Sequence, residues 1–406
     1  MRNPYSENIY RLLGIPLDSD QNTIYTAHKN MQIRLRAQAS YNIKDPLESA
    51  LKANRNEYAL RNALTEINNP MARIQTRLFW FNHSLVFQDG NFNKIDIGSI
   101  EQDIDKPSNS IISYHILAVF YHASSVSILH SLLGTVHKKS DKLMEESMYK
   151  TLDDYLRKAF AYWNIIISSD DFWQYFISIE LRSRFRVPAS ENDFSRLRGK
   201  SRQLVEQPVF TLMYDLLDND VLRPLELGLN MLRSTPWEQE NINVISYQAS
   251  GLVYRSIERI TAEIESKVNI LARKGYISNE SIKEFAIGIY GRYEIEIKPR
   301  LQLLVTFKDI EYRENKAREL VAKCLRTVSL FLWEKYDEKD WVEDLLREAH
   351  NLSEDTFIQY RIEEDLETIR PIVSEYFKKQ INNVCKGLIA EYNCYPDNLN
   401  STLDST

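Results

Sequence analysis

The chain has 406 residues and contains few glycines and few cysteines. Its 11 glycines fall well below the ~7% of residues usual in globular proteins, which leaves little material for glycine-rich phosphate loops or tight β-turns. Its three cysteines, Cys324, Cys385 and Cys394, are odd in number and lack a Cys-x-x-Cys spacing. Neither a disulfide framework nor a zinc site is therefore expected. These absences favour helices and a reducing compartment, and we expect a cytoplasmic protein.

Familiar catalytic motifs are also absent. The sequence contains no Gly-x-Ser-x-Gly, no Gly-x-x-x-x-Gly-Lys-Ser and no His-Glu-x-x-His. One run of acids, Glu363-Glu364-Asp365, could in principle do acid–base work, but consecutive residues on a helix point in different directions, which favours a solvated surface. We therefore expect a protein that is not an enzyme and needs no cofactor. A helical enzyme with a pocket between its helices is a minor alternative.

The first eighty residues contain signals for four helices. Gly14-Ile15-Pro16 ends a short apolar helix, because glycine tolerates the left-handed conformation and proline cannot continue a helix. Asp18-Ser19-Asp20 offers capping oxygens for a second helix, whose apolar stripe recurs with a helical period. A third helix is expected to end at Asn68-Asn69-Pro70, and a fourth follows. The core predicted for these helices includes Leu13, Ile24, Met31, Leu64 and Phe81.

This order of signals resembles that of a J domain. Leu13-Gly14 matches the family's Leu-Gly, Ile24 and Ala27 match core positions of its second helix, and Asn69-Pro70 matches its Asp-Pro after the third helix. The resemblance covers residues 1–81. It implies a helical hairpin domain and a co-chaperone role toward a heat-shock-seventy-type chaperone. An unrelated helical bundle is the alternative.

The tripeptide through which J domains act on that chaperone is missing. In the family, a His-Pro-Asp sequence after the second helix triggers ATP hydrolysis by the chaperone, and the matching positions here are Arg36, Ala37 and Gln38. Residues 45–56 also resemble an insertion between the second and third helices. The chain therefore resembles a degenerate J protein, and we expect it not to stimulate the chaperone's ATPase through the usual contact.

Basic residues of the second helix are the predicted partner-binding residues. Residues 1–80 contain 11 Lys and Arg against 7 Asp and Glu, whereas residues 334–370 contain 13 acids against 5 bases. The acidic stretch argues against nucleic-acid binding, because phosphates require clustered Lys and Arg. A basic second helix in J domains contacts an acidic groove on the chaperone, so the resemblance implies the same role for Lys29, Arg34 and Arg36. The alternatives are a solvated helix face or a contact with the acidic stretch of the same chain.

A long stretch without charged side chains runs from Pro107 to His137. Its length would allow a membrane-spanning helix, but its seven serines and four histidines favour a buried central helix, so no membrane partner is expected. The histidines His115, His122, His130 and His137 are at least seven residues apart, which is about 10.5 Å along a helix, too far to share one zinc ion. They are predicted to form hydrogen bonds in the core or between helices.

The remaining sequence predicts helices in close succession. Residues 82–110 contain Gly, Pro, Asn, Asp and Ser and are interpreted as a linker. A helical region with the uncharged helix follows over 111–190, and the polar stretch Pro188 to Arg198 is interpreted as a second boundary. A C-terminal helical body is expected over 191–396, and a disordered tail over 397–406.

The predicted fold is all-α, with an N-terminal J-like helical hairpin domain and a helical-hairpin or solenoid-like C-terminal body. Its predicted role is that of a non-enzymatic, co-chaperone-like adaptor that presents a helical surface to protein partners. The main alternative is a helical scaffold whose J-like hairpin is a structural docking module independent of chaperones.

Overall fold

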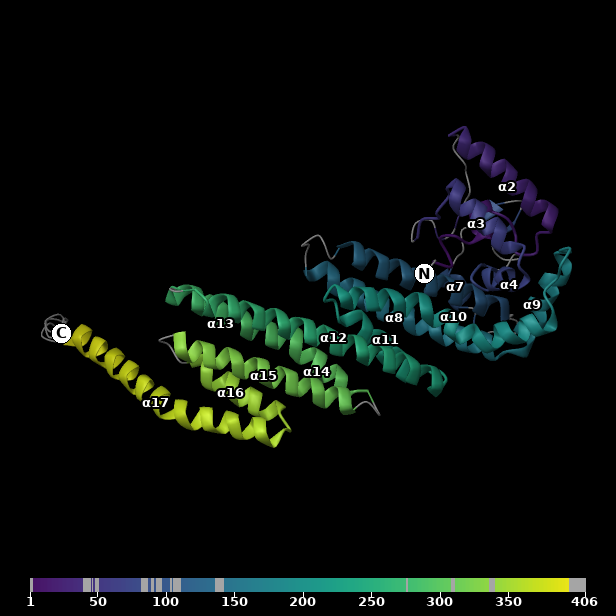
Figure 1. Ribbon diagram of the computed structural model, residues 1–406. Coiled ribbons are helices and arrows are strands. Elements are labelled where there is room, and N and C mark those ends of the chain that lie inside the picture. Colours follow the sequence, from purple (N-terminus) through teal and green to yellow (C-terminus); the bar gives the residue numbers. More distant parts are fainter. Residues whose placement is uncertain are drawn as a thin grey trace, which may run out of the picture. The chain divides into compact units, whose positions relative to one another are not determined.

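The described part of the chain is all-α apart from one pair of two-residue strands (Figure 1). The computed structural model describes residues 3–38, 45, 47, 51–81, 87–88, 91–92, 97–102, 104, 111–135, 142–274, 277–307, 311–335 and 340–393. The predicted tail lies outside these residues, as does most of the predicted linker. The chain divides into two compact units, Met1–Ala249 and Ser250–Thr406. The all-α prediction is confirmed.

The first unit begins with four helices whose ends follow local sequence signals. They are α1 (Ile9–Leu13), α2 (Gln21–Arg36), α3 (Glu57–Ile67) and α4 (Pro70–Leu78). Gly14 closes α1 with a φ of 65°, a conformation that glycine adopts without steric cost. Asp20, Asn56 and Asn69 cap the next three helices, and each side chain accepts a hydrogen bond from a backbone N–H of the first turn. The predicted stops at Gly14 and Asn69-Pro70 and the predicted start at Asp20 are confirmed.

The core of these helices includes four of the five residues predicted for it. The buried four are Leu13, Ile24, Met31 and Phe81. The prediction for Leu64 is wrong, because this side chain is only half-buried. Helix α3 centres its buried face on Leu60, Ala63 and Ile67, and at about 100° per residue Leu64 falls at the edge of that face.

The other elements of the first unit include a long central helix, α7. They are β1 (Phe87–Gln88), β2 (Asn91–Phe92), α6 (Ile97–Gln102), α7 (Ile111–Thr135), α8 (Lys142–Ser168), α9 (Asp170–Arg182), α10 (Glu191–Asp218), α11 (Arg223–Ser234) and α12 (Gln239–Ala272), whose last part belongs to the second unit. Helix α7 packs against α8 and α10. Among the described residues it is the one helix long and apolar enough to cross a membrane, and 67% of its most apolar window is buried inside the protein. The prediction of a buried central helix is confirmed.

The histidines of α7 connect it to other parts of the unit. Nε2 of His115 and of His122 lies 2.8 Å from a backbone carbonyl oxygen, that of Leu78 and Val205 respectively. A carbonyl only accepts, so each Nε2 donates. The Tyr5 hydroxyl lies 2.5 Å from Nδ1 of His122. Burial lowers the pKa of both imidazoles to about 4, so both are neutral at pH 7. The predicted hydrogen-bonding role is confirmed for these two, whereas His137 lies outside the described residues.

A buried ion cluster holds α4 against α9. Arg73 and Arg77 both donate to the carboxylate of Glu180, and these three side chains are 1% exposed. Nε of Arg77 also donates to the Tyr10 hydroxyl at 2.8 Å. Burial alone would raise the pKa of the Glu180 carboxyl, but the hydrogen bond from Arg73 and the charge of Arg77 outweigh burial, so this pKa lies below its usual value. The first four helices are therefore held against α9 within one compact unit.

The polar stretch from Pro188 to Arg198 starts a helix. Ser190 and Asp193 form a reciprocal capping box at the first turn of α10, which satisfies backbone N–H groups that have no partner within the helix. The polar side chains that follow lie in the first turns of α10, and most of them are exposed. Polarity here marks the exposed side of a helix that continues to Asp218.

The second unit consists of helices that pack largely in sequence order. After α12 they are α13 (Asn279–Arg292), the π-helical turn η1 (Tyr293–Ile297), α14 (Lys298–Val305), α15 (Glu311–Lys335), α16 (Asp340–Leu352) and α17 (Thr356–Asn393). Helix α16 packs against both α15 and α17. Helix α17 continues through Pro371. Glu363 and Glu364 are exposed, and Asp365 pairs with Arg326 at 2.7 Å, so the run of acids forms a helix surface.

Candidate protein-binding surfaces

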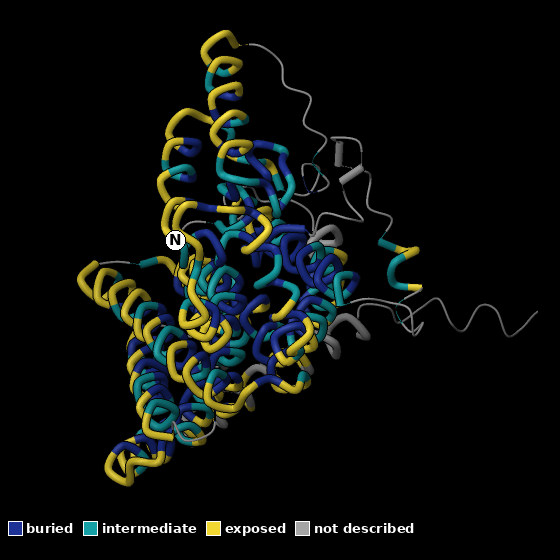
Figure 2. Tube along the Cα trace, turned by 90° about the vertical axis from the view of Figure 1, so that its right-hand side faces the viewer, coloured by how far each residue is buried: buried dark blue, intermediate teal, exposed yellow. Residues whose placement is uncertain are grey.

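Helix α2 places the three predicted partner-binding residues on two different sides. Lys29, Arg34 and Arg36 are all exposed, because α2 turns Ile24 and Met31 toward the core. Figure 2 shows α2 as the uppermost helix, with exposed residues along its outer side. At about 100° per residue, Lys29 and Arg36 lie about 20° apart around the helix axis, whereas Arg34 lies about 140° from Lys29. Lys29 and Arg36 therefore share one side of the helix and Arg34 lies on another, and the partner-binding role of all three stays a prediction.

Two exposed apolar side chains flank the cations that share a side. Tyr25 is 40% exposed and Ile33 is 56% exposed, and each lies within about 40° of Lys29 around the helix axis. The Tyr25 hydroxyl donates to Oδ1 of Asn68 at 3.0 Å, which fixes this ring against the end of α3. We call Tyr25, Lys29, Ile33 and Arg36 the α2 face. It combines positive charge with apolar area, which suits an acidic protein surface that has an apolar centre.

Arg36 is already paired within the chain. Its Nε lies 3.0 Å from Oε1 of Glu57, the first residue of α3, and the two side chains are 69% and 46% exposed. An exposed ion pair of this kind contributes less than about 1 kcal/mol, so a partner's carboxylate can replace Glu57 at small cost. Lys29 and Arg34 form no ion pair with any other residue that the structure describes.

Helix α2 ends at the positions that match the missing tripeptide. The N–H of Ala37 donates to the carbonyl of Ile33 at 3.0 Å, and Gln38 follows with a φ of 50°. A proline at position 37 would remove this hydrogen bond and disfavour the helical conformation of Arg36. Restoring His-Pro-Asp at these positions would therefore shorten α2 as well as add the missing side chains.

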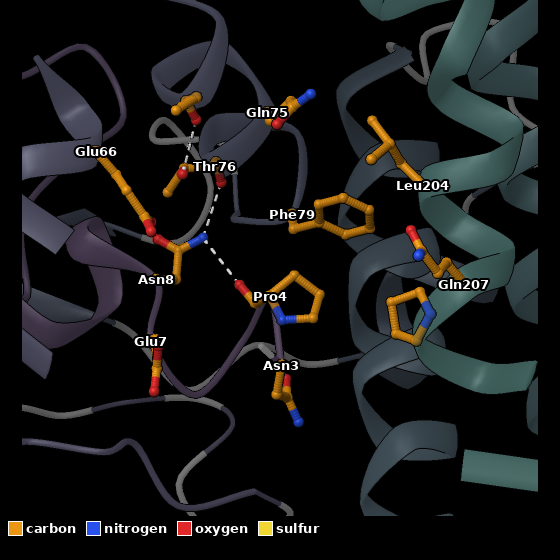
Figure 3. Close-up of a pocket in the computed structure, with 12 residues that line it drawn as sticks. Asn3, Pro4, Glu7, Asn8, Glu66, Gln75, Thr76, Phe79, Leu204 and Gln207 are labelled. Atoms are coloured by element: carbon orange, nitrogen blue, oxygen red, sulfur yellow. Dashed lines mark hydrogen bonds between the residues drawn. The ribbon is translucent and has the colours of Figure 1, made fainter. Parts of the chain in front are cut away.

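A cleft of about 330 Å³ lies between the N-terminal segment with α4 on one side and α10 on the other. Figure 3 shows Glu66 and Asn8 on the first side, Leu204 and Gln207 on the second, and Phe79 between them. Asn8 is buried and caps α1. Its Nδ2 donates to the carbonyl of Thr76 in α4 at 2.8 Å, so this wall of the cleft is fixed.

A smaller cleft of about 170 Å³ adjoins the first. Asn3 and Pro208 line both clefts, and the second continues along α10 to Asp215 beside His130 and Leu133 of α7. Nδ2 of Asn3 lies 3.3 Å from Nε2 of His130, so the N-terminal segment is tied to α7 where the clefts adjoin. We call the two clefts together the α10 groove.

The two clefts and the α2 face combine polar, apolar and charged side chains without a metal-binding cluster. Among the described residues, no group of three His, Cys, Asp or Glu is arranged to hold a metal ion. Burial raises the pKa of the Glu206 carboxyl to about 7, a value that would suit acid–base chemistry. This carboxylate, however, accepts a hydrogen bond from Nε1 of the buried Trp237 and lines neither cleft. Glu206 therefore has a structural role, and the described surfaces are suited to binding.

The ion cluster and the α10 groove were not predicted from the sequence. Arg73 and Arg77 are one helical turn apart among apolar residues, and Pro208 lies inside a helix, so each feature has a local signal. Neither signal identifies a partner, because Glu180 is 107 and 103 residues away from the two arginines.

Comparison with protein-family models, with curated proteins and with solved structures finds no match for this chain. The function is therefore inferred from the α2 face and its surroundings.

Proposed function

We propose that the protein is a non-enzymatic adaptor of co-chaperone type, which binds an acidic surface of a protein partner through the α2 face. The observation that carries this proposal is the exposure of Lys29 and Arg36 on one side of α2, next to the exposed Ile33. The resemblance of the first 81 residues to a J domain supports a heat-shock-seventy-type chaperone as the partner. A cytoplasmic location and the absence of a nucleic-acid or membrane partner belong to the same proposal.

The geometry favours docking without activation of the chaperone. Arg36, Ala37 and Gln38 supply neither the histidine nor the aspartate of the activating tripeptide. The end of α2 uses the N–H of Ala37 in a hydrogen bond to Ile33 that a proline cannot make. The adaptor therefore holds its partner by charge and apolar contact, and leaves the partner's ATPase rate unchanged.

One observation favours the second candidate, a scaffold that works independently of chaperones. Arg73 and Arg77 join α4 to Glu180 of α9 in a fully buried cluster, so the N-terminal helices also serve as part of the helical body. In a scaffold this cluster would be the main reason for keeping the four helices. The α2 face would then be a solvated surface.

Affinity purification of the full-length chain from its own cells separates the two functions. The wild type is compared with a Lys29→Glu/Arg36→Glu variant and with Arg34→Glu, a charge reversal on another side of the same helix. The adaptor proposal predicts enrichment of a heat-shock-seventy-type chaperone with the wild type and with Arg34→Glu, and its loss with the double variant. Recovery of other proteins without the chaperone, in equal amounts from all three, would favour the scaffold.

A further inference from the structure

We propose that the α10 groove binds a short peptide segment of a second protein, in which Lys or Arg residues flank an apolar side chain. This site differs from the α2 face in position and has the opposite charge. An adaptor that connects two proteins needs two such surfaces, and the groove supplies the second one. The proposal does not depend on the identity of the partner that binds α2.

The groove has the length of a peptide segment. Its lining residues on α10 extend from Leu204 to Asp215, twelve residues that span about 16 Å of helix. An extended chain covers this distance with about five residues. Phe79 and Pro208 provide apolar walls in the larger cleft, and Leu133 does so in the smaller one. The larger cleft, about 330 Å³ in volume, can take one large apolar side chain.

The charge of the lining selects a cation. Glu7 and Glu66 line the larger cleft and Asp215 lines the smaller one, and the described lining of both contains no Lys or Arg. Glu7 also accepts a hydrogen bond from Nδ2 of Asn54 at 3.4 Å, which holds this carboxylate at the edge of the N-terminal segment. Burial lowers the pKa of His130, although the charge of Asp215 partly opposes this, so the imidazole adds little positive charge at pH 7. The potential in the groove therefore favours Lys and Arg over acidic residues.

Pro208 lies where the two clefts meet and interrupts the backbone hydrogen bonds of α10. It lies inside α10 and has no N–H, so the carbonyl of Leu204 loses the donor that a regular helix would provide. The proline ring lies next to the carbonyl four residues earlier, and both Leu204 and Pro208 line the larger cleft. The amides of Gln75 and Gln207, which line the same cleft, can form hydrogen bonds with the backbone of a bound peptide.

Fluorescence anisotropy with the full-length chain tests the proposal. The probe is a fluorescein-labelled peptide of sequence Lys-Lys-Leu-Phe-Lys, and its control has glutamate in place of each lysine. We expect the basic peptide to bind, and its affinity to fall as the NaCl concentration is raised. Its affinity should be at least about tenfold higher than that of the acidic peptide. Equal binding of the two peptides, or binding of neither, would overturn the proposal.

A matched pair of variants places the peptide in the groove. Gln207→Lys puts a positive charge into the lining, whereas Gln203→Lys puts the same charge one turn earlier on α10, at an exposed position outside the groove. Gln207→Lys should lower the affinity for the basic peptide at least about tenfold, whereas Gln203→Lys should change this affinity less than about twofold. Equal affinities of the two variants would place the peptide elsewhere and refute the site.

Two further measurements separate recognition of a peptide from attraction of any cation. Ala72→Leu adds volume inside the larger cleft without changing its charge. This variant should bind the peptide more weakly, while its circular dichroism spectrum and its thermal unfolding stay as in the wild type. Spermidine supplies cations without an apolar side chain. If spermidine displaces the peptide at equal concentration, the groove recognises positive charge alone and the peptide proposal is wrong. If a large excess is needed, the apolar contact contributes as proposed.

Discussion

Replacement of Glu180 by glutamine should destabilise the contact between α4 and α9 more than any surface change. The Glu180 carboxylate is the acidic partner of two buried guanidinium groups, those of Arg73 and Arg77, and it accepts a further hydrogen bond from the N–H of Ala189 at 2.8 Å. Glutamine keeps the size of the side chain but removes its charge, so both arginines lose their compensating charge. Breaking a buried ion pair in this way costs about 3–5 kcal/mol.

Hydrogen exchange measured peptide by peptide gives the appropriate readout, because a chain with two units does not unfold in one step. A loss of 3–5 kcal/mol corresponds to exchange that is about 100- to 5000-fold faster in α4 and α9. The control is Glu238→Gln, which removes an exposed partner of Arg202 and should cost less than about 1 kcal/mol. If Glu180→Gln accelerates exchange in α4 by less than about tenfold, the cluster does not hold these helices together.

The pH dependence of this contact has a defined sign. The pKa of Glu180 is lowered in the folded protein, so its charge stabilises the fold fully above the unfolded pKa of about 4.3. This contribution is lost as the pH falls below that value toward the folded pKa. Replacing Arg73, Arg77 and Glu180 together by Met, Met and Leu should restore most of the stability and remove the acid sensitivity, since apolar residues of similar volume often substitute for buried ion pairs without loss.

Three further changes test the packing of the first unit. Burial raises the folded pKa of Glu206 to about 7, so the stability of the first unit should fall as pH rises from about 4.3 to 7, by at most about 1.4 kcal/mol per pH unit. Glu206→Gln should lack this slope when the stability is measured by hydrogen exchange in α10, after correction for the pH dependence of intrinsic exchange. Leu60 is fully buried, so Leu60→Ala should lower the free energy of unfolding by about 2–5 kcal/mol and Leu64→Ala by less than half as much. Hydrogen exchange in α3 measures both losses, and equal losses would contradict the observed buried face of the helix. A Cβ at Gly228 would lie 2.6 Å from Sδ of Met213 in the buried contact of α11 with α10, whereas one at Gly199 meets nothing within 4 Å. Hydrogen exchange in α10 and α11 should therefore show Gly228→Ala destabilised by about 1–3 kcal/mol and Gly199→Ala stabilised by about 0.5–1 kcal/mol.

Local features of the fold could be predicted from the sequence. Gly14 and Asn69-Pro70 mark helix ends because their effects depend on backbone conformation and on hydrogen bonds within a few residues. The uncharged stretch around His115 and His122 indicates a buried helix for a similar reason, since burial of a charge without a partner is costly. Each of these inferences requires only neighbours along the chain.

Features that depend on distant residues could not be predicted. The pairing of His122 with Tyr5 joins residues 117 positions apart, and no periodicity relates them. The position of Arg34 on another side of α2 is different, because it follows from the helical period alone and could have been predicted. The division at Ala249 falls inside the continuous helix α12, and Gly251 beside it weakens a helix without ending it, so the sequence does not mark a boundary there. The α10 groove depends on four separate segments, residues 3–8, 66–79, 126–133 and 204–215, and only the assembled structure brings them together.

Binding of a purified heat-shock-seventy-type chaperone to the full-length chain tests the central claim most directly. Isothermal titration at low and physiological salt would compare the wild type with Lys29→Glu/Arg36→Glu and with Arg34→Glu. We predict that the wild type binds, that binding weakens with salt because charges contribute to it, and that the double reversal weakens it at least about tenfold whereas Arg34→Glu changes it little. No binding by the wild type, or an equal affinity of all three proteins, would contradict the assignment of the α2 face as the docking surface of an adaptor.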